Sequence, residues 1–242
     1  MFEKIKKKYA LNNSYFKLRN PQFPQTPEEC FEYSKEYGEL PFRYEGYENS
    51  ENEYECDWWL YDCYVEYQKR AGVYNSQFFT PRETAERMAD LADYYFDDST
   101  EDVLDACCGF GTITRALRHK YGFLVDGFDT DSVLVELYKK WSDGIGEQKD
   151  FREHTEKYKH IICNPPYEMS VLTEFLEWLH ETLKDDGTAI LLIPKGFIDK
   201  ERPKKLVQVL EKFHVIFRED MREEFARTKT RAEIVVLRKN IE

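Results

Sequence analysis

The feature that most restricts the fold is an alternation, from residue 77 onward, of short apolar runs with stretches of helical periodicity. Short apolar runs bounded by turn residues are typical of buried strands, and apolar residues at i, i+3 and i+4 are typical of amphipathic helices. The candidate strands are 102–105, 122–128, a short segment before 150, the segment that ends at 163, 188–193, 215–217 and 233–237. The first candidate helix begins at 80–81, with Thr80 as its cap and Pro81 at the first helical position. The next begins at 112, and the others contain residues 133–141, 171–179 and 206–213. This pattern predicts an α/β fold with a doubly wound, mostly parallel, seven-stranded sheet.

The carboxyl ends of parallel strands form the edge of the sheet where α/β proteins bind their ligands. Gly109, Asp129, Asp150 and Asn164 each follow a candidate strand. We therefore expect these four residues to lie along one edge of the sheet.

An Asn-Pro-Pro-Tyr segment, residues 164–167, ends one of the candidate strands. Proline lacks a backbone donor and holds the residue before it extended, so the strand stops and Asn164 projects from the sheet edge. The carbonyl oxygens of Asn164 and Pro165 are then free to accept hydrogen bonds, and Tyr167 adds a flat ring. Acceptors beside an aromatic plate suit a planar ring that carries an exocyclic amine. A plain strand-ending turn is the alternative.

A glycine-bearing turn follows the strand 102–105. Gly109 and Gly111 lack a Cβ, so the backbone there can approach a ligand closely, and the start of the next helix favours a negative group. Asp129 comes about twenty residues later, where a carboxylate can accept both hydroxyls of a ribose. The third glycine of the dinucleotide fingerprint is absent, since Thr114 holds its place. An ordinary tight turn remains an alternative, and Asp129 could instead cap the next helix, a role for which Asp131 competes.

Residues 1–76 lack the alternation of strands and helices. Carboxylates dominate from 28 to 57, with aromatic residues interleaved, and Trp58, Tyr61 and Val65 share one helical face. We expect an acidic, aromatic-rich and partly helical N-terminal extension that packs on a domain formed by residues 77–242. A recognition element for a partner or substrate is the alternative.

The charge balance is acidic, with a formal net charge of -12. Proteins that bind phosphates without sequence preference are usually basic, so a lone non-specific DNA binder is disfavoured. The local basic residues that could meet phosphates are Lys195, Lys200, Arg202, Lys204, Lys205, Arg227, Lys229 and Arg231. A solvated charged face explains them equally well.

The 6 cysteines are scattered and lack zinc-ligand spacing, so no metal site is expected. No apolar run that would suit a signal peptide follows the first residues, and the longest core run, 189–193, is too short to span a bilayer. These patterns predict a reduced, cytoplasmic protein with no membrane partner.

In the content and order of these motifs, residues 77–242 resemble the S-adenosylmethionine-dependent amino-group methyltransferases, in particular the DNA adenine-N6 methylases. Gln77–Arg82 resembles the family motif before the first strand and is similar to that of the methylation subunits of restriction systems. The segments that resemble the later motifs are Asp105–Gly111, Asp129, Asp150–Phe151, Asn164–Tyr167 and, faintly, Phe225 with Thr228 and Thr230. The resemblance implies a Rossmann-like class I methyltransferase fold with S-adenosylmethionine as cofactor.

The resemblance also implies roles for single residues. Among the implied cofactor-binding residues, Phe79, Thr80 and Pro81 would border the methionine moiety, and Asp105, Gly109 and Gly111 would line the methionine and ribose side. Asp129 would bind the ribose hydroxyls, and Asp150 and Phe151 would lie at the adenine. Asn164 is the remaining implied cofactor-binding residue. The implied catalytic residues are Asn164, Pro165, Pro166 and Tyr167, and the implied substrate-binding residues are Tyr167 and Phe225. Asn164 and Pro165 would accept the two hydrogens of the target amine, and Tyr167 would stack on the target base.

The expected activity is methyl transfer to the N6 amine of adenine in DNA. The same chemistry on RNA adenine or on a protein glutamine amide is an alternative, and a non-catalytic cofactor-binding or regulatory subunit of a modification complex is another. Family members with this motif order usually carry a large target-recognition domain after the catalytic one, which this sequence lacks. We expect target recognition to come from residues 1–76, from a second subunit or a homodimer, or to be absent.

Overall fold

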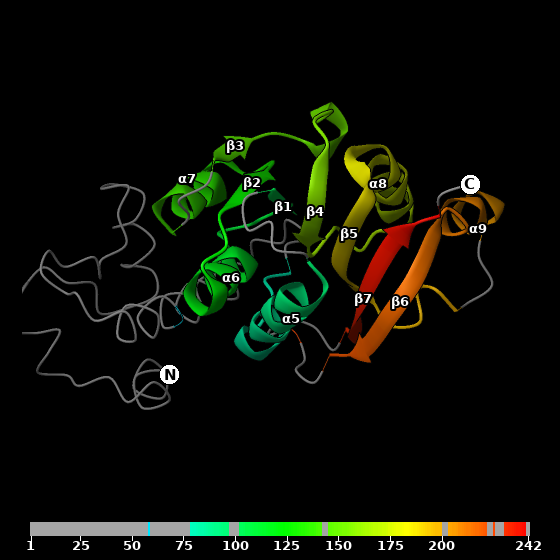
Figure 1. Ribbon diagram of the computed structural model, residues 1–242. Helices are drawn as coiled ribbons and strands as arrows, with labels where there is room; N and C mark the ends of the chain where they lie inside the picture. The colour runs from blue at the N-terminus through cyan, green and yellow to red at the C-terminus, as the bar shows by residue number, and fades with distance from the viewer. Residues whose placement is uncertain are drawn as a thin grey trace, which may run out of the picture. The chain divides into compact units, whose positions relative to one another are not determined.

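The computed structural model describes residues 58, 78–96, 102–141, 145–199, 203–221, 225 and 230–240 (Figure 1). The chain divides into two units, Met1–Asn75 and Ser76–Glu242. In the first unit only Trp58, which is helical and buried, belongs to the described residues. The other expectations for residues 1–76 lie outside the described residues. All the helices and strands that the structure delimits belong to the second unit.

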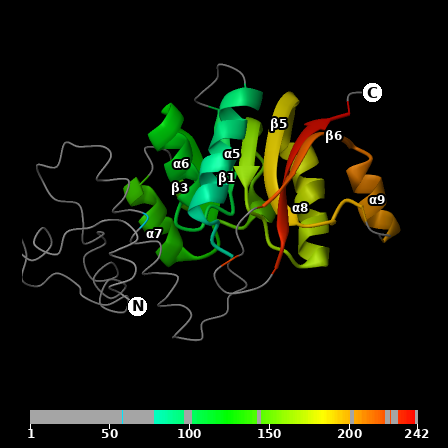
Figure 2. The ribbon, with the colours of Figure 1, turned by 90° about the horizontal axis from the view of Figure 1, so that it is seen from below.

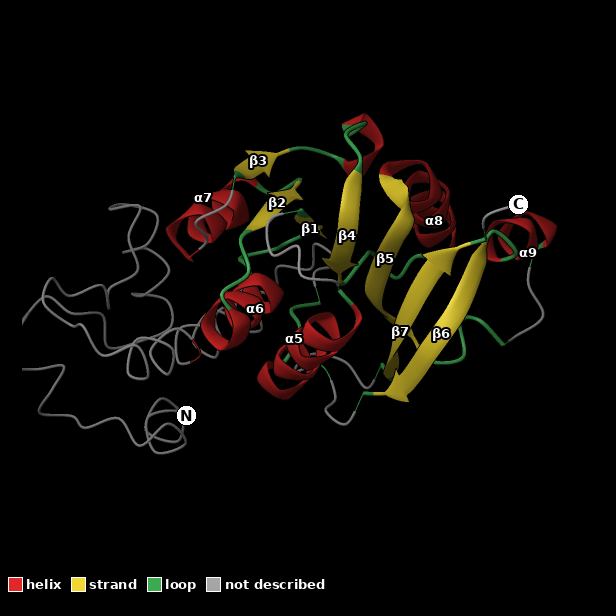
Figure 3. Ribbon diagram, viewed as in Figure 1, coloured by secondary structure: helices red, strands yellow, loops and turns green. Residues whose placement is uncertain are grey.

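Within the described residues, seven strands form one sheet in the order β3-β2-β1-β4-β5-β7-β6 (Figure 3). The strands are β1 (Val103–Ala106), β2 (Val125–Asp129), β3 (Gly146–Gln148), β4 (Tyr158–Cys163), β5 (Leu183–Pro194), β6 (Phe213–Asp220) and β7 (Ala232–Lys239). The first five run parallel, and β7 is antiparallel to both β5 and β6. The predicted mostly parallel, doubly wound sheet is confirmed.

Helices cover both faces of this sheet (Figures 1 and 2). They are α5 (Arg82–Tyr95), α6 (Thr112–Tyr121), α7 (Ser132–Trp141), α8 (Met169–Thr182) and α9 (Lys204–Leu210), with a short 3-10 helix η1 (Phe151–Glu153). Helices α5 and α6 pack together on one face, and α8 and α9 pack together on the other. From β1 the chain winds outward through β2 to β3, and from β4 it winds the opposite way through β5. The strand order therefore reverses between β1 and β4, and such a reversal is where α/β sheets bind ligands.

The central strands are buried on both faces, which is why they are continuously apolar in sequence. The segment 188–193 of β5 is buried throughout, whereas β6, at the edge of the sheet, is buried only at Phe213 and is exposed or partly buried at its other residues. Helix α6 ends at Gly122, which adopts a left-handed conformation with φ 72° and donates its N–H to the carbonyl of Arg118. Glycine adopts this conformation without steric cost, so it stops the helix cleanly.

Several boundaries differ from the predictions. Helix α9 ends at Leu210, and Phe213, predicted as its last residue, instead begins β6. Strand β5 starts at Leu183, because this residue pairs with Tyr158 of β4 before a shift in register. Thr80 does not cap α5: Pro81 occupies the cap position, and no side chain caps the first turn.

Of the helices that the structure describes, none is long and apolar enough to cross a membrane.

Candidate functional site

The carboxyl ends of β1, β2, β3 and β4 lie along one edge of the sheet, as their parallel registers require. This arrangement brings together residues that are far apart in the sequence. The N–H of Gly109, in the turn after β1, donates to Oδ2 of Asp129, at the end of β2, at 2.9 Å. The turn after β1 and the acid after β2 therefore form one structural unit, as the motif spacing predicts.

The turn Cys107–Gly111, which we call the glycine turn, is built from left-handed backbone conformations. Positive φ angles occur at Cys107 (64°), Gly109 (55°) and Gly111 (88°). A Cβ on Gly111 would lie 2.9 Å from Cδ2 of Tyr138, whose hydroxyl is held by a 2.6 Å hydrogen bond to the carbonyl of Val125. Gly111 is thus required by both conformation and space, and it leads directly into α6. Cys107 lacks the freedom of glycine and holds a strained conformation, which is common at ligand sites.

Asp105, in β1 beneath the glycine turn, is a buried carboxylic acid with one oxygen unpaired. Oδ2 accepts a 2.8 Å hydrogen bond from the Thr114 hydroxyl, and Oδ1 is buried with no partner among the described residues. Burial raises the pKa of Asp105 to about 7, and the nearby Asp129 carboxylate contributes in the same direction. A buried acceptor without a hydrogen-bond partner costs free energy, so Oδ1 is suited to bind a ligand that brings a donor or a positive charge.

Asp129 uses both carboxylate oxygens to order the backbone. Oδ2 accepts from Gly109, and Oδ1 accepts from the N–H of Asp131 at 3.0 Å. Each oxygen keeps a second lone pair, so the carboxylate can still accept from a pair of hydroxyls. Asp131 caps α7, because its Oδ1 accepts from the N–H of Leu134 at 3.4 Å. The alternative interpretation of Asp129 as the cap of this helix is therefore wrong. Burial raises the pKa of Asp129 as well.

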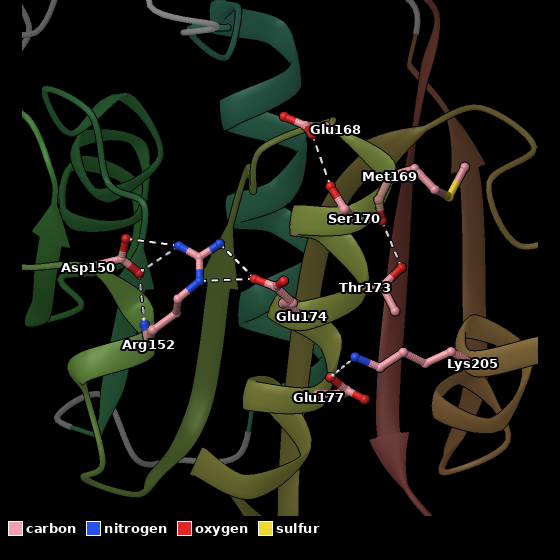
Figure 4. A network of polar contacts seen from close by, with 9 residues as sticks. All are labelled: Asp150, Arg152, Glu168, Met169, Ser170, Thr173, Glu174, Glu177 and Lys205. Carbon is pink, nitrogen blue, oxygen red and sulfur yellow. Dashed lines mark hydrogen bonds and ion pairs between the residues drawn. The ribbon is translucent and has the colours of Figure 1, made fainter. Parts of the chain in front are cut away.

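Asp150 lies after β3 and is paired with Arg152. Oδ1 of Asp150 accepts from the Arg152 N–H at 2.9 Å, and the guanidinium bridges Asp150, at 3.0 Å, to Glu174 of α8, at 2.7 Å (Figure 4). The central carbon of this guanidinium, Cζ of Arg152, lies 4.6 Å from the ring centroid of Phe151. Phe151 packs against Phe175 at 5.4 Å and belongs to the hydrophobic core, so its place beside the cofactor remains a prediction.

Asn164, directly after β4, is held by the segment that precedes α5. Its Nδ2 donates to the backbone carbonyl of Phe78 at 2.6 Å and to the hydroxyl of Thr80 at 3.3 Å. Its Oδ1 is buried and has no hydrogen-bond partner among the described residues. The side chain therefore offers a fixed, desolvated acceptor at the sheet edge, next to the buried Pro165.

Three aromatic rings beside this amide form what we call the aromatic cluster: Phe78, Tyr167 and Phe225. Tyr167 stacks on Phe78 with centroids 5.2 Å apart and an interplanar angle of 17°, and meets Phe225 edge-on at 5.7 Å. Phe78 and Phe225 are 5.4 Å apart. One face of Tyr167 is thus covered by Phe78, and a target ring must use the other face or take the place of Phe78. The Tyr167 hydroxyl is buried without a partner among the described residues, and burial raises its pKa well above the usual range.

The segment 78–81 connects the two parts of the site. Phe79 packs edge-on against Phe110 at 4.7 Å, and its ring would lie 3.6 Å from a Cβ on Gly109, so it borders the glycine turn. Phe78 and Thr80 contact Asn164 instead. Pro81 is buried at the start of α5. The sequence motif therefore corresponds to a physical bridge between the turn after β1 and the segment after β4.

The described cysteines do not show the properties of nucleophiles. Burial raises the pKa of the Cys107, Cys108 and Cys163 thiols well above their usual range, so they remain protonated near neutral pH. In the described ranges there is no group of three or more His, Cys, Asp or Glu side chains that could hold a metal ion.

A sequence model described as a methyltransferase domain matches residues 77–233. The chain belongs to this family. No curated protein sequence matches it. The matched residues contain the whole site, from Phe78 in the segment before α5 to Phe225 in the aromatic cluster.

Solved structures with related folds include several methyltransferases. A protein from Listeria monocytogenes described as a class I S-adenosylmethionine-dependent methyltransferase superposes with a TM-score of 0.67 at 13% identity, covering 99% of this chain and 88% of that one. A protein from Vibrio vulnificus described as the modification subunit of a type I restriction enzyme superposes with a TM-score of 0.58 at 15% identity, covering 80% of this chain and 50% of that one. A protein from Pyrococcus horikoshii described as an RNA methyltransferase superposes with a TM-score of 0.53 at 19% identity, covering 68% of this chain and 88% of that one. The predicted Rossmann-like class I fold is confirmed, and S-adenosylmethionine is the methyl donor that accompanies this fold.

Phe78 is the site residue that the sequence motifs did not assign. It lies inside the motif segment 77–82, and it is aromatic like its neighbour Phe79. Its contacts, through the ring to Tyr167 and Phe225 and through the carbonyl to Asn164, depend on a fold that joins residues 86 or more positions apart. An aromatic doublet inside such a motif is a signal that could have marked it.

Proposed function

We propose that this chain transfers a methyl group from S-adenosylmethionine to the exocyclic N6 amine of adenine in DNA. The observation that carries the proposal is the Asn164 amide, whose Nδ2 is anchored at 2.6 Å to the Phe78 carbonyl while Oδ1 stays buried and unpaired beside the aromatic cluster. A neutral acceptor beside aromatic rings suits a neutral amine on a flat ring.

The residues of the glycine turn and the neighbouring acids fit the cofactor. When bound, S-adenosylmethionine supplies an electrophilic methyl group. The unpaired Oδ1 of buried Asp105 would hold the positively charged amino group of its methionine part, and the free lone pairs of Asp129 would accept from its ribose hydroxyls. Asp150 would accept from its adenine amine while Arg152 keeps the carboxylate in place.

The residues after β4 would act on the target. An exocyclic amine is a weak nucleophile because its lone pair is delocalised into the ring. Oδ1 of Asn164 and the carbonyl of Pro165 would each accept one N–H, which favours a pyramidal nitrogen with its lone pair turned toward the methyl group. Pro166 would keep the segment rigid, and Tyr167 and Phe225 would contact the target ring. Holding two reactants in a productive orientation supplies most of the acceleration in such a step.

An adenine within duplex DNA would have to leave the base stack to reach this site. The aromatic cluster offers surfaces that can replace the lost stacking, typically worth about 1–3 kcal/mol per base. Target recognition would come from residues 1–76 or from a second subunit or copy of the chain. The restriction-modification subunit among the structures of similar fold accords with DNA as the substrate.

RNA adenine is the second candidate substrate. The same residues would perform the same transfer, and one protein of similar fold is described as an RNA methyltransferase. The net charge of -12 disfavours binding that depends only on phosphates, whether those of DNA or of RNA. A protein glutamine amide presents the same NH2 group and belongs with this alternative. A cofactor-binding subunit without catalysis would have no use for the unpaired Asn164 acceptor.

Transfer from methyl-labelled S-adenosylmethionine tests the proposal. The chain is incubated separately with DNA, RNA and protein, and labelled products are digested and identified by chromatography. We expect label in N6-methyldeoxyadenosine, formed on the order of 10²–10³-fold more slowly by Asn164→Ala. Label in RNA adenine or in methylated glutamine would move the activity to the alternatives. Cofactor binding without label in any pool would contradict the enzymatic proposal.

A further inference from the structure

The Asn164 side chain depends on two groups of the segment before α5. Its Nδ2 donates to the backbone carbonyl of Phe78 at 2.6 Å and to the Thr80 hydroxyl at 3.3 Å. We propose that Thr80 is a positioning residue that, together with the Phe78 carbonyl, holds the Asn164 amide in place, so that Oδ1 faces the target amine. This inference rests on the proposed function, and it differs from the role beside the methionine moiety that the family resemblance implies.

The need for such a residue follows from the shape of an amide. The two ends of an Asn side chain are nearly equal in size, so packing alone does not decide which end faces the target. Only the NH2 end can donate a hydrogen bond. The Phe78 carbonyl can only accept, so it selects the orientation with Nδ2 toward the segment 78–81, and the Thr80 hydroxyl accepts from the same NH2 and anchors the amide there a second time. The reversed amide would place Oδ1 against the Phe78 carbonyl and present a donor to the target amine.

Burial makes this second anchor hard to replace. Thr80 is only 2% exposed, so water cannot readily replace its hydroxyl if the side chain is changed. The hydroxyl takes no part in capping α5, because Pro81 is the cap residue and no side chain caps the helix. Contact with Asn164 is thus the interaction that the structure shows for this oxygen. The Phe78 carbonyl belongs to the backbone, which leaves Thr80 as the anchor that a substitution can remove.

The decisive comparison is between Thr80→Val, which keeps the shape and removes the hydroxyl, and Thr80→Ser, which keeps the hydroxyl. Thr84→Val is the matched control, because Thr84 is also buried and lies four residues further along the chain, within α5. We expect Thr80→Val to lower kcat about two- to tenfold, the loss of one hydrogen bond, with unchanged affinity for S-adenosylmethionine. Thr80→Ser should recover most of the rate, and Thr84→Val should match the wild type.

Weaker cofactor binding by Thr80→Val with unchanged kcat would show that Thr80 serves the cofactor and would overturn the inference. An equal loss of rate in the Val and Ser variants would also overturn it, since the hydroxyl would then be irrelevant. Should Thr80→Val not fold, Thr80→Ala against Thr80→Ser makes the same comparison.

A second measurement does not need activity. The side-chain NH2 signals of Asn164 in an ¹⁵N–¹H NMR spectrum are identified by their absence in Asn164→Ala. We expect these signals to shift or broaden in Thr80→Val and to keep their positions in Thr80→Ser and Thr84→Val. Unchanged signals in Thr80→Val would refute the positioning role. Because this result does not depend on turnover, failure of the inference is distinguishable from failure of the proposed function.

Discussion

The two sides of the sheet edge differ in chemistry. On one side lie three carboxylates: Asp105 within β1, Asp129 at the end of β2 and Asp150 after β3, each already bound by a hydroxyl, a backbone N–H or a guanidinium. After β4 stands a neutral amide with one unpaired oxygen, surrounded by the aromatic cluster. We call these the carboxylate side and the amide side.

The difference shows how one sheet edge can hold two reactants. Carboxylates suit the hydroxyl and amino groups of a polar cofactor. A carboxylate facing a target amine would lose its hydration as a charged group, and this costs more free energy than burying a neutral amide oxygen. The segment 78–81 contacts both sides, so it can fix their positions relative to each other. Four changes test whether the two sides work separately.

The largest effect is expected on the amide side. Asn164→Ala should lower kcat on the order of 10²–10³-fold, by analogy with the loss of one oxyanion-hole donor, and leave the affinity for S-adenosylmethionine nearly unchanged. Turnover kinetics and calorimetry on one preparation measure both quantities. Asn240→Ala is the control, because Asn240 follows β7 at the opposite end of the sheet and donates from Nδ2 to the carbonyl of Glu211. Loss of cofactor binding together with activity would mean that the two sides are not separable.

The next effect concerns the buried acid of the carboxylate side. The pKa of Asp105 is about 7 in the folded protein against 3.8 for an ordinary Asp, so the folded state binds its proton more tightly. The stabilisation from this proton is full below about pH 4 and is lost as the pH rises through 7. Asp105→Asn should therefore gain stability relative to the wild type between pH 5 and pH 8, on the order of a few kcal/mol.

Urea unfolding of both proteins across this pH range measures the difference. His154 acts in the opposite direction, since burial lowers its pKa: its contribution is full above about pH 6.5 and is lost as the pH falls below that value. Because His154 is present in both proteins, the comparison cancels it. Parallel pH profiles for the wild type and Asp105→Asn would contradict the raised pKa.

A smaller effect separates cofactor binding from helix capping on the carboxylate side. Asp129→Ala should weaken cofactor binding by about 1–3 kcal/mol, because a charged hydrogen-bond acceptor is lost. Asp131→Ala should instead lower the stability by about 0.5–2 kcal/mol, since Asp131 caps α7, with little change in cofactor affinity. Calorimetry and thermal unfolding distinguish the two outcomes. Equal binding losses in both variants would show that Asp129 acts through the backbone alone.

The smallest effects are expected at Tyr167. Tyr167→Ala should raise KM for the target by the equivalent of about 1–3 kcal/mol, if its ring contacts the base. Tyr167→Phe should be nearly neutral or slightly stabilising, because the buried hydroxyl has no partner among the described residues. Steady-state kinetics and thermal unfolding measure these changes. A large loss of activity in Tyr167→Phe would assign the hydroxyl a role that ring contact does not explain.

Local chemistry was readable from the sequence because it depends on neighbours along the chain. The apolar segment 188–193 predicts a strand buried on both faces, and Gly111 predicts a turn that only glycine tolerates. The motif order places Gly109, Asp129, Asp150 and Asn164 at one sheet edge, because parallel strands share the direction in which they end. These inferences describe elements and their order.

The tertiary structure decided the contacts between distant segments. The first residues of β5 include Lys184, Asp185 and Asp186, which suggest a polar turn, yet pairing of Leu183 with Tyr158 begins the strand before them. Arg152 joins Asp150 to Glu174 of α8, a contact that no spacing predicts. Thr80 looks like a helix cap in sequence, but the fold places its hydroxyl against Asn164, 84 positions away. Hydrogen bonding between such segments depends on three-dimensional distance, which periodicity and motif spacing do not encode.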